Sequence, residues 1–292
     1  MLLYLGFRLA ALAVRVLPVR VSYAVARGAG VAAFLVWRGG HRRCVDNMRR
    51  VAGGDERLAR RYARRSFENY AVYLIDFLRL SGLTPREIEA RVAYDDWAAL
   101  EERRAGNGIV FVTVHLGNWD LGAAILSLKG FSVAVLADRF ANARLNRLVL
   151  GSREQLGMTI IPTDRMGPGI LRALRRNDVV AMLADVPLPE RGVKVEFFGD
   201  TVSVSDGPAR LALRAGASVV AAVLPRLHPW KDRVAGEVSP VPFEPTGEHD
   251  RDAHALTQAL FSHLEQLIRR HPDQWYIFRH LWVADAAAAR TA

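Results

Sequence analysis

Short apolar runs rich in β-branched residues recur along this chain and alternate with segments of helical periodicity. The runs cover 109–114, 132–137, 158–161, 179–184 and 218–224, and the helical segments cover 119–129, 142–156, 166–176 and 207–215. Continuous apolar runs of this length are typical of strands that are buried on both faces of a sheet. The alternation therefore predicts an α/β fold with a mostly parallel central sheet flanked by helices. A helix near 250–270 and a last strand at 275–278 complete the expected domain.

The first 45 residues have a different composition from the rest of the chain. They contain seven arginines and no acidic residue, and the remaining side chains are mostly apolar. The arginines interrupt every stretch of about 18 apolar residues, the length that a membrane-spanning helix needs. Arg20 and Arg27 are seven positions apart and share a helix face, as do Arg8 and Arg15, and Pro18 separates the two pairs.

This spacing predicts basic amphipathic helices over residues 1–45, lying on an anionic membrane surface with their guanidinium groups toward the headgroups. Residues 46–292 then form the α/β domain. The alternative is a pair of core helices whose arginines extend along the surface into solvent.

The net charge of +10, from 40 basic and 30 acidic residues, indicates an anionic partner. The densest arginines, between residues 42 and 65, lie on predicted helices beside the N-terminal segment, which favours a membrane surface over nucleic acid. The single cysteine, Cys44, excludes a disulfide within the chain and a cysteine-based zinc site. The chain has no phosphate-binding P-loop motif and no dinucleotide-binding glycine motif, so nucleotide hydrolysis and dinucleotide redox chemistry have no support.

A histidine and an aspartate stand at the first strand-to-helix junction. His115 follows the strand that ends near Val114, Gly117 permits a tight turn, and Asn118 can cap the next helix. Asp120 lies in the first turn of that helix, near the positive end of its dipole. Its carboxylate could fold back onto the imidazole and leave one ring nitrogen as a general base. The alternative is a strand-end histidine with only local hydrogen bonds.

The six residues 115–120, HLGNWD, resemble the H-x-x-x-x-D motif of glycerolipid-type acyltransferases. They are most similar to the bacterial lysophospholipid acyltransferases related to the lipid A late acyltransferases and the phosphatidylinositol mannoside acyltransferases. Further segments match this family in the same order, namely Arg42-Arg43, Asp46–Arg50, 192–199 and the closing 271–276. Lipid A members usually carry glutamate in place of the aspartate, so the motif is closer to that of the mannoside branch.

The resemblance implies an acyl transfer from acyl-CoA or an acyl carrier protein to a hydroxyl of a membrane glycolipid. It makes His115 the general base and Asp120 its orienting carboxylate, with no metal, no cofactor and no covalent intermediate. The implied acceptor is a phosphatidylinositol mannoside, and the alternatives are a lipid A-type precursor or another lysophospholipid. The implied location is the cytoplasmic face of the plasma membrane, as a peripheral protein. A hypothesis of another class is a basic membrane-binding protein without catalysis.

Several further residues are candidates for substrate binding. Arg153 lies where the family tends to carry a functional arginine, which could bind phosphate or pair with a site carboxylate. Asp138, Arg139 and Asp185 follow strands and are expected at the same rim of the sheet.

The family also often carries a carboxylate near Glu196 that supports the histidine. Glu190 is a rival, and spacing does not choose between the two. Phe197 and Phe198 are candidates for the lining of the acyl pocket, although strand spacing favours a core position for one of them.

Overall fold

The computed structural model describes residues 11–14, 16–137, 142–162, 166–188 and 191–282. Its centre is a six-stranded sheet in the order β10-β8-β2-β5-β3-β4. The five strands β8, β2, β5, β3 and β4 run parallel to one another. The edge strand β10 runs antiparallel to β8. The α/β class is therefore confirmed, with a mixed sheet. The strands are β2 (Ile109–Thr113), β3 (Val133–Ala137), β4 (Met158–Pro162), β5 (Val179–Leu183), β8 (Ser218–Val223) and β10 (Glu237–Val241).

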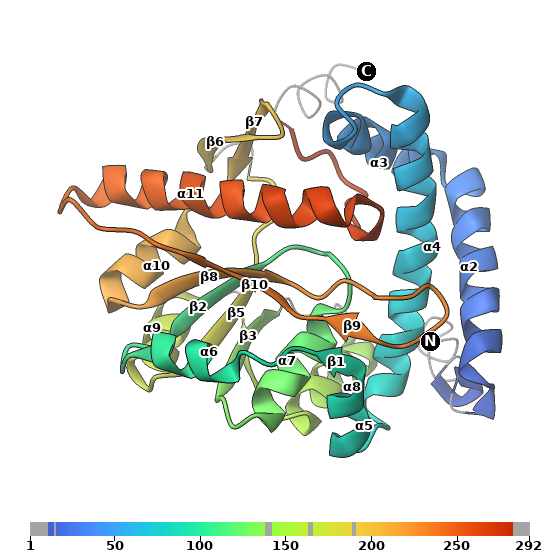
Figure 1. Cartoon of the computed structure of the whole chain (residues 1–292), viewed down its shortest axis with the longest axis horizontal. Helices are drawn as coiled ribbons and strands as arrows, with labels where there is room; N and C mark the ends of the chain where they lie inside the picture. Colours follow the sequence, from blue (N-terminus) through green and yellow to red (C-terminus); the bar gives the residue numbers. More distant parts are fainter. Residues whose placement is uncertain (1–10, 15, 138–141, 163–165, 189–190, 283–292) are drawn as a thin grey trace.

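Helices cover both faces of the sheet, as α11 and α7 on its opposite sides show in Figure 1. Alternate residues of β2 point to opposite faces, so Val110 and Val112 join one hydrophobic core and Ile109 and Phe111 join the other. The first core includes α9 (Met166–Arg175), α10 (Gly207–Ala215) and α11 (His249–Arg270). The second includes α5 (Pro85–Arg91), α6 (Trp97–Arg104) and α7 (Trp119–Leu128), while α8 (Ala143–Gln155) packs beside β4.

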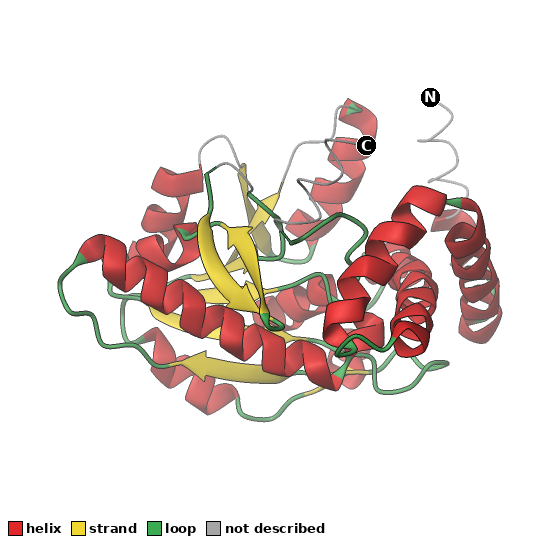
Figure 2. Ribbon diagram, turned by 90° about the horizontal axis from the view of Figure 1, so that it is seen from above, coloured by secondary structure: helices red, strands yellow, loops and turns green. Residues whose placement is uncertain are grey.

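Two long helices, α2 (Val19–Val36) and α4 (Glu56–Leu80), lie side by side at one end of the molecule (Figures 1 and 2). They cross closely at Gly30, where an added Cβ would lie 2.7 Å from the Cα of Glu68. The expected boundary at residue 45 falls inside helix α3 (Arg38–Val51). The division of the chain into two domains stays a prediction.

Helix α2 is, among the described residues, the one helix long and apolar enough to cross a membrane by length and composition, with a mean hydropathy of 1.4. The side chain of Arg27 is only 15% exposed and pairs with Glu68 of α4 at 3.5 Å. Arg27 therefore does not reach toward solvent beside the exposed Arg20, contrary to the helix-face expectation. Arg8 and Arg15 lie outside the described residues.

The last strand expected over 275–278 is absent, which corrects the sequence prediction. Trp275 makes only an isolated bridge to Leu116, and the N–H of Tyr276 donates to the carbonyl of His115 at 2.7 Å. Both edges of β2 are already paired with β5 and β8, so this segment contacts the turn beyond β2 instead.

Two small pairings were not expected from the periodicity. The strands β6 (Val193–Phe197) and β7 (Asp200–Val204) form an antiparallel hairpin that packs against α11. Its turn places Phe198 and Gly199 at φ of +53° and +73°. The strands β1 (Val92–Ala93) and β9 (Val234–Ala235) pair in parallel below the central sheet.

Candidate active site

A tight turn over residues 115–118, called the site turn below, links the end of β2 to α7. Gly117 has a φ of +66°, and an added Cβ would lie 1.9 Å from the carbonyl oxygen of Leu224. Only glycine combines this backbone conformation with so close an approach. The N–H of Gly117 donates to the carbonyl of Gln274 at 3.1 Å, and that of Asn118 donates to the carbonyl of Leu224 at 2.9 Å. The side chain of Asn118 caps α7, as expected, by accepting from the N–H of Leu121.

The imidazole of His115 is held by Asp185. The Nδ1 of His115 lies 2.7 Å from Asp185 Oδ1, and the backbone N–H of His115 donates to Asp185 Oδ2 at 2.9 Å. The indole N–H of Trp275 donates to the same Oδ2 at 2.9 Å. With Nδ1 protonated toward a carboxylate, the neutral ring presents Nε2 as an acceptor. Nε2 has no hydrogen-bond partner within the part of the chain that the structure describes.

Asp120 makes a different set of contacts from the expected one. Its carboxylate accepts from the hydroxyl of Tyr73 at 2.6 Å and from Arg153, whose Nε and Nη2 lie at 2.7 and 3.3 Å. The hydrogen bond to the imidazole therefore comes from Asp185, and not from Asp120. Asp120 sits in the first turn of α7, where its side chain meets α4 and α8. Of the two possibilities for Arg153, the structure shows the pairing with a site carboxylate.

The charges around the imidazole act in opposite directions on its pKa. Burial lowers the pKa of His115, but the charge and hydrogen bond of Asp185 outweigh it and leave the pKa raised, while the nearby Arg279 acts to lower it. Burial would raise the pKa of Asp185, yet the hydrogen bonds from His115 and Trp275 and the charge of His115 hold it below the usual range. The pair is therefore a carboxylate beside an imidazole that binds a proton readily.

Among the described residues, the predicted Glu196 is not brought to His115. Glu196 lies on β6 with an exposed side chain, and its backbone bonds to Gln258 of α11. Phe197 and Phe198 are both buried in a hydrophobic core. Asp138, Arg139 and Glu190 lie outside the described residues.

An apolar cavity, with a volume of about 50 Å³, lies beside the site turn. It lies between the sheet and α7, and its walls include Phe111, Trp119, Ala123 and Ala181. The rings of Trp119 and His115 meet edge to face with centroids 5.2 Å apart. A largely apolar cavity next to one polar reactive group is the usual form of a site for an apolar ligand.

Two residues of this site, Tyr73 and Trp275, were not singled out from the sequence. Burial and the carboxylate of Asp120 raise the pKa of Tyr73 well above its usual value, so its phenol stays protonated and donates. The signals were present, since Tyr73 lies in an aromatic-rich helical stretch and Trp275 in the closing segment matched to the family. No group of three or more His, Cys, Asp or Glu side chains in the described ranges is placed to hold a metal ion.

Comparison with known proteins gives a consistent result. The chain matches the family of bacterial lipid A biosynthesis acyltransferases over residues 2–284. It is 32% identical over 239 residues to a phosphatidylinositol mannoside acyltransferase of Mycobacterium tuberculosis (strain ATCC 25618 / H37Rv), which covers 78% of this chain and 72% of the relative. It is 29% identical over 296 residues to the protein of the same name from Mycolicibacterium smegmatis, which covers 98% of this chain and 92% of the relative.

Proposed function

Because this chain belongs to the bacterial lipid A biosynthesis acyltransferase family, we propose that it moves a fatty acyl group from an acyl thioester to a hydroxyl of a phosphatidylinositol mannoside. The observation that carries the proposal is the imidazole of His115, whose Nδ1 is held by Asp185 and whose ring contacts the wall of an apolar cavity at Trp119. A base beside an apolar cavity fits a reaction between a hydroxyl and a fatty thioester.

The proposed reaction needs one base and no covalent enzyme intermediate. His115 Nε2 takes the proton of the acceptor hydroxyl while its oxygen attacks the thioester carbonyl carbon. The C–O bond forms, the C–S bond breaks, and the departing thiolate takes the proton from the imidazolium. Asp185 keeps the imidazole oriented and stabilises its charged form.

Asp120 has a supporting role in this proposal. It binds Arg153 and Tyr73, from α8 and α4, and so fixes the first turn of α7 next to His115. Arg153 is placed in the same support, through its two hydrogen bonds to Asp120, rather than on substrate phosphate.

The cavity is proposed to hold the acyl chain of the donor. It is lined by apolar side chains of the hydrophobic core that includes α6 and α7, among them Leu100 of α6, Phe111 of β2 and Val238 of β10. The donor headgroup, coenzyme A or a carrier protein, then lies outside, where the basic surface of the chain attracts its negative charge.

Helix α2 is proposed to rest on the cytoplasmic face of the plasma membrane and give the enzyme access to its glycolipid. Apart from Arg20, its exposed residues are uncharged, and they are Val21, Ala24, Val25, Gly28, Ala29, Ala32, Ala33, Leu35 and Val36. An apolar stripe of this length on a surface helix is a feature of interfacial membrane contact. The exposed Trp37 follows directly after the helix, at a position suited to the headgroup region.

The acceptor class is tested by product analysis. The purified full chain is mixed with palmitoyl-CoA, or palmitoyl-carrier protein, and vesicles that contain a phosphatidylinositol mannoside, a lipid A precursor or a lysophospholipid. Mass spectrometry should show one added palmitoyl group on the mannoside. Acylation of the lipid A precursor or the lysophospholipid alone would replace the proposed acceptor, and no product with either donor would contradict the acyl transfer.

A further inference from the structure

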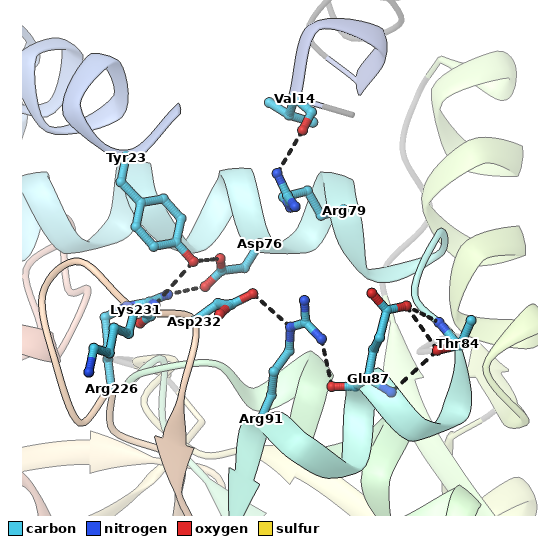
Figure 3. Close-up of polar contacts among 10 residues, drawn as sticks. All are labelled: Val14, Tyr23, Asp76, Arg79, Thr84, Glu87, Arg91, Arg226, Lys231 and Asp232. Atoms are coloured by element: carbon cyan, nitrogen blue, oxygen red, sulfur yellow. Dashed lines mark hydrogen bonds and ion pairs between the residues drawn. The ribbon is translucent and has the colours of Figure 1, made fainter. Parts of the chain in front are cut away.

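A buried polar cluster joins the N-terminal helix to the body of the fold. Tyr23 of α2, Asp76 of α4 and Arg226 of the loop after β8 meet there (Figure 3). The hydroxyl of Tyr23 donates to one carboxylate oxygen of Asp76, and Arg226 donates to the other. The Nη1 of Arg226 also lies 3.2 Å from the Tyr23 hydroxyl oxygen. All three side chains are largely withdrawn from solvent, with Tyr23 fully buried and the other two less than 10% exposed.

Burying the charges of Asp76 and Arg226 costs free energy of folding, because both groups lose their hydration. Apolar side chains of similar volume often stabilise a fold as well as a buried ion pair does. A fully bonded polar group does, however, fix one arrangement of the elements that carry it. The cluster thus fixes α2 to one place on α4 and on the loop that begins at Arg226.

The backbone of Arg226 is connected to the site turn by hydrogen bonds through one residue, Gln274. The backbone N–H of Arg226 donates to Gln274 Oε1 at 2.7 Å, and Gln274 Nε2 donates to the carbonyl of Arg226 at 3.0 Å. The carbonyl of Gln274 accepts the N–H of Gly117 at 3.1 Å. Two residues before Arg226, the carbonyl of Leu224 accepts the N–H of Asn118 and leaves no room for a Cβ on Gly117. Arg226 and its neighbour Leu224 are therefore both connected by hydrogen bonds to the turn that carries His115.

We propose that Tyr23, Asp76 and Arg226 are positioning residues, which couple the placement of α2 to the alignment of His115. The proposal rests on the acyl transfer proposed above and on α2 as the membrane-contacting helix. A lipid surface that holds α2 against α4 thereby keeps the site turn in its working position, and loss of the cluster lowers the rate of transfer without loss of substrate binding.

The test uses Tyr23→Phe and Arg226→Lys, which remove hydrogen bonds but keep the ring and the charge. Gln274→Met is a third variant, outside α2, that cuts the link between Arg226 and the turn. Arg79→Met is the matched control, because Arg79 of α4 donates to the carbonyl of Val14 at 2.8 Å and has no hydrogen bond to the site turn within the described residues. Acyl transfer, vesicle co-sedimentation and thermal unfolding are measured for the full chain with anionic vesicles that carry the mannoside.

Tyr23→Phe, Arg226→Lys and Gln274→Met should each lower kcat by about 2- to 30-fold, the usual range for a coupling network, with KM for the acyl thioester unchanged. Vesicle binding should be retained, and Arg79→Met should keep the kcat of the unmodified chain. An equal kcat loss in Arg79→Met, an unchanged kcat in all three test variants, or a loss that only tracks the unfolded fraction would overturn the coupling. Absence of transfer by the unmodified chain would instead overturn the proposed function, and the coupling with it.

Discussion

At the scale of single residues, the site depends on a carboxylate that lies 70 positions from the histidine it holds. Thr113 pairs with Leu183 in the parallel register of β2 and β5. Two further residues along each strand lead to His115 and Asp185, so the sheet brings the two side chains to the same rim. Asp120 is much closer in sequence, but the helix it begins directs it toward Tyr73 and Arg153.

The sequence predicts Asp185 at the rim but not its bond to His115. That bond follows from β2 and β5 being neighbours in the sheet, which periodicity does not reveal because it identifies strands without ordering them. His115 itself is predictable, since it directly follows a buried strand and precedes a capped helix.

Asp185→Asn tests the orienting role. In the proposed reaction the neutral imidazole is the base, so its raised pKa should place the acidic limb of kcat/KM above the ordinary histidine value of about 6.5. The substitution removes the raising effect of Asp185. It leaves burial and Arg279, which lower the pKa of His115, against the smaller raising effect of Asp120. The limb should move to lower pH, and kcat should fall by about 10²- to 10⁴-fold.

Asp178→Asn is the control for this profile, because Asp178 is also buried but lies just before the opposite end of β5. Its profile should match that of the unmodified chain. A limb that stays in place in Asp185→Asn would show that Asp185 does not set the protonation of His115.

At the scale of elements, the sequence predicts the alternation of strands and helices well, because continuous runs of β-branched apolar residues favour buried strands over helices. It does not predict that residues 275–278 lie outside the central sheet. That apolar segment is a reasonable strand by composition, but β2 has no free edge to receive it. The cavity cannot be predicted from the sequence either, since it lies where α6, α7 and four separate strands meet.

Gly117→Ala tests the close approach of the site turn to Leu224. The added Cβ has no space, so the variant should lose acyl transfer and unfold at a lower temperature than the unmodified chain. Gly130→Ala is the matched control, because Gly130 also has a positive φ, of +87°, with nothing within 4 Å of the added Cβ. It should cost about 1–2 kcal/mol of backbone strain and keep kcat. Equal effects of the two substitutions would contradict the packing argument.

Ala123→Phe tests the cavity as the acyl site. A ring at this position on α7 fills part of the space, so kcat/KM should fall for palmitoyl thioesters and be retained for octanoyl thioesters. Leu128→Phe, at an exposed position on the same helix, should leave the chain-length profile unchanged. A parallel loss with all chain lengths would place the acyl chain elsewhere.

At the scale of the whole molecule, α2 links the surface proposed to contact lipid to the body of the fold. Its inner face carries Tyr23 and Phe34 against the rest of the fold, whereas Val21 and Val25 point outward, 46% and 65% exposed. Removal of the whole segment would therefore also uncover the side of α4 on which it packs. Substitutions on the outer face separate membrane contact from folding more cleanly.

Val21→Glu combined with Val25→Glu should weaken binding to anionic vesicles by about tenfold or more, because two carboxylates replace apolar area and repel the surface. Thermal unfolding should stay unchanged, since neither side chain is buried. Met166→Glu, at an exposed position on α9, serves as the control and should bind vesicles as before. Undiminished binding by the double variant would place the membrane contact on another surface.

The most direct test of the central claim is the rate of glycolipid acylation by His115→Ala on mannoside-containing vesicles, measured by mass spectrometry beside Asp120→Asn. The account predicts a loss of about 10²- to 10⁴-fold in folded His115→Ala, the contribution expected of a general base. Asp120→Asn should lose less, because its side chain supports the turn and does not contact the imidazole. A full rate in His115→Ala, or a greater loss in Asp120→Asn, would contradict the assignment of His115 as the base.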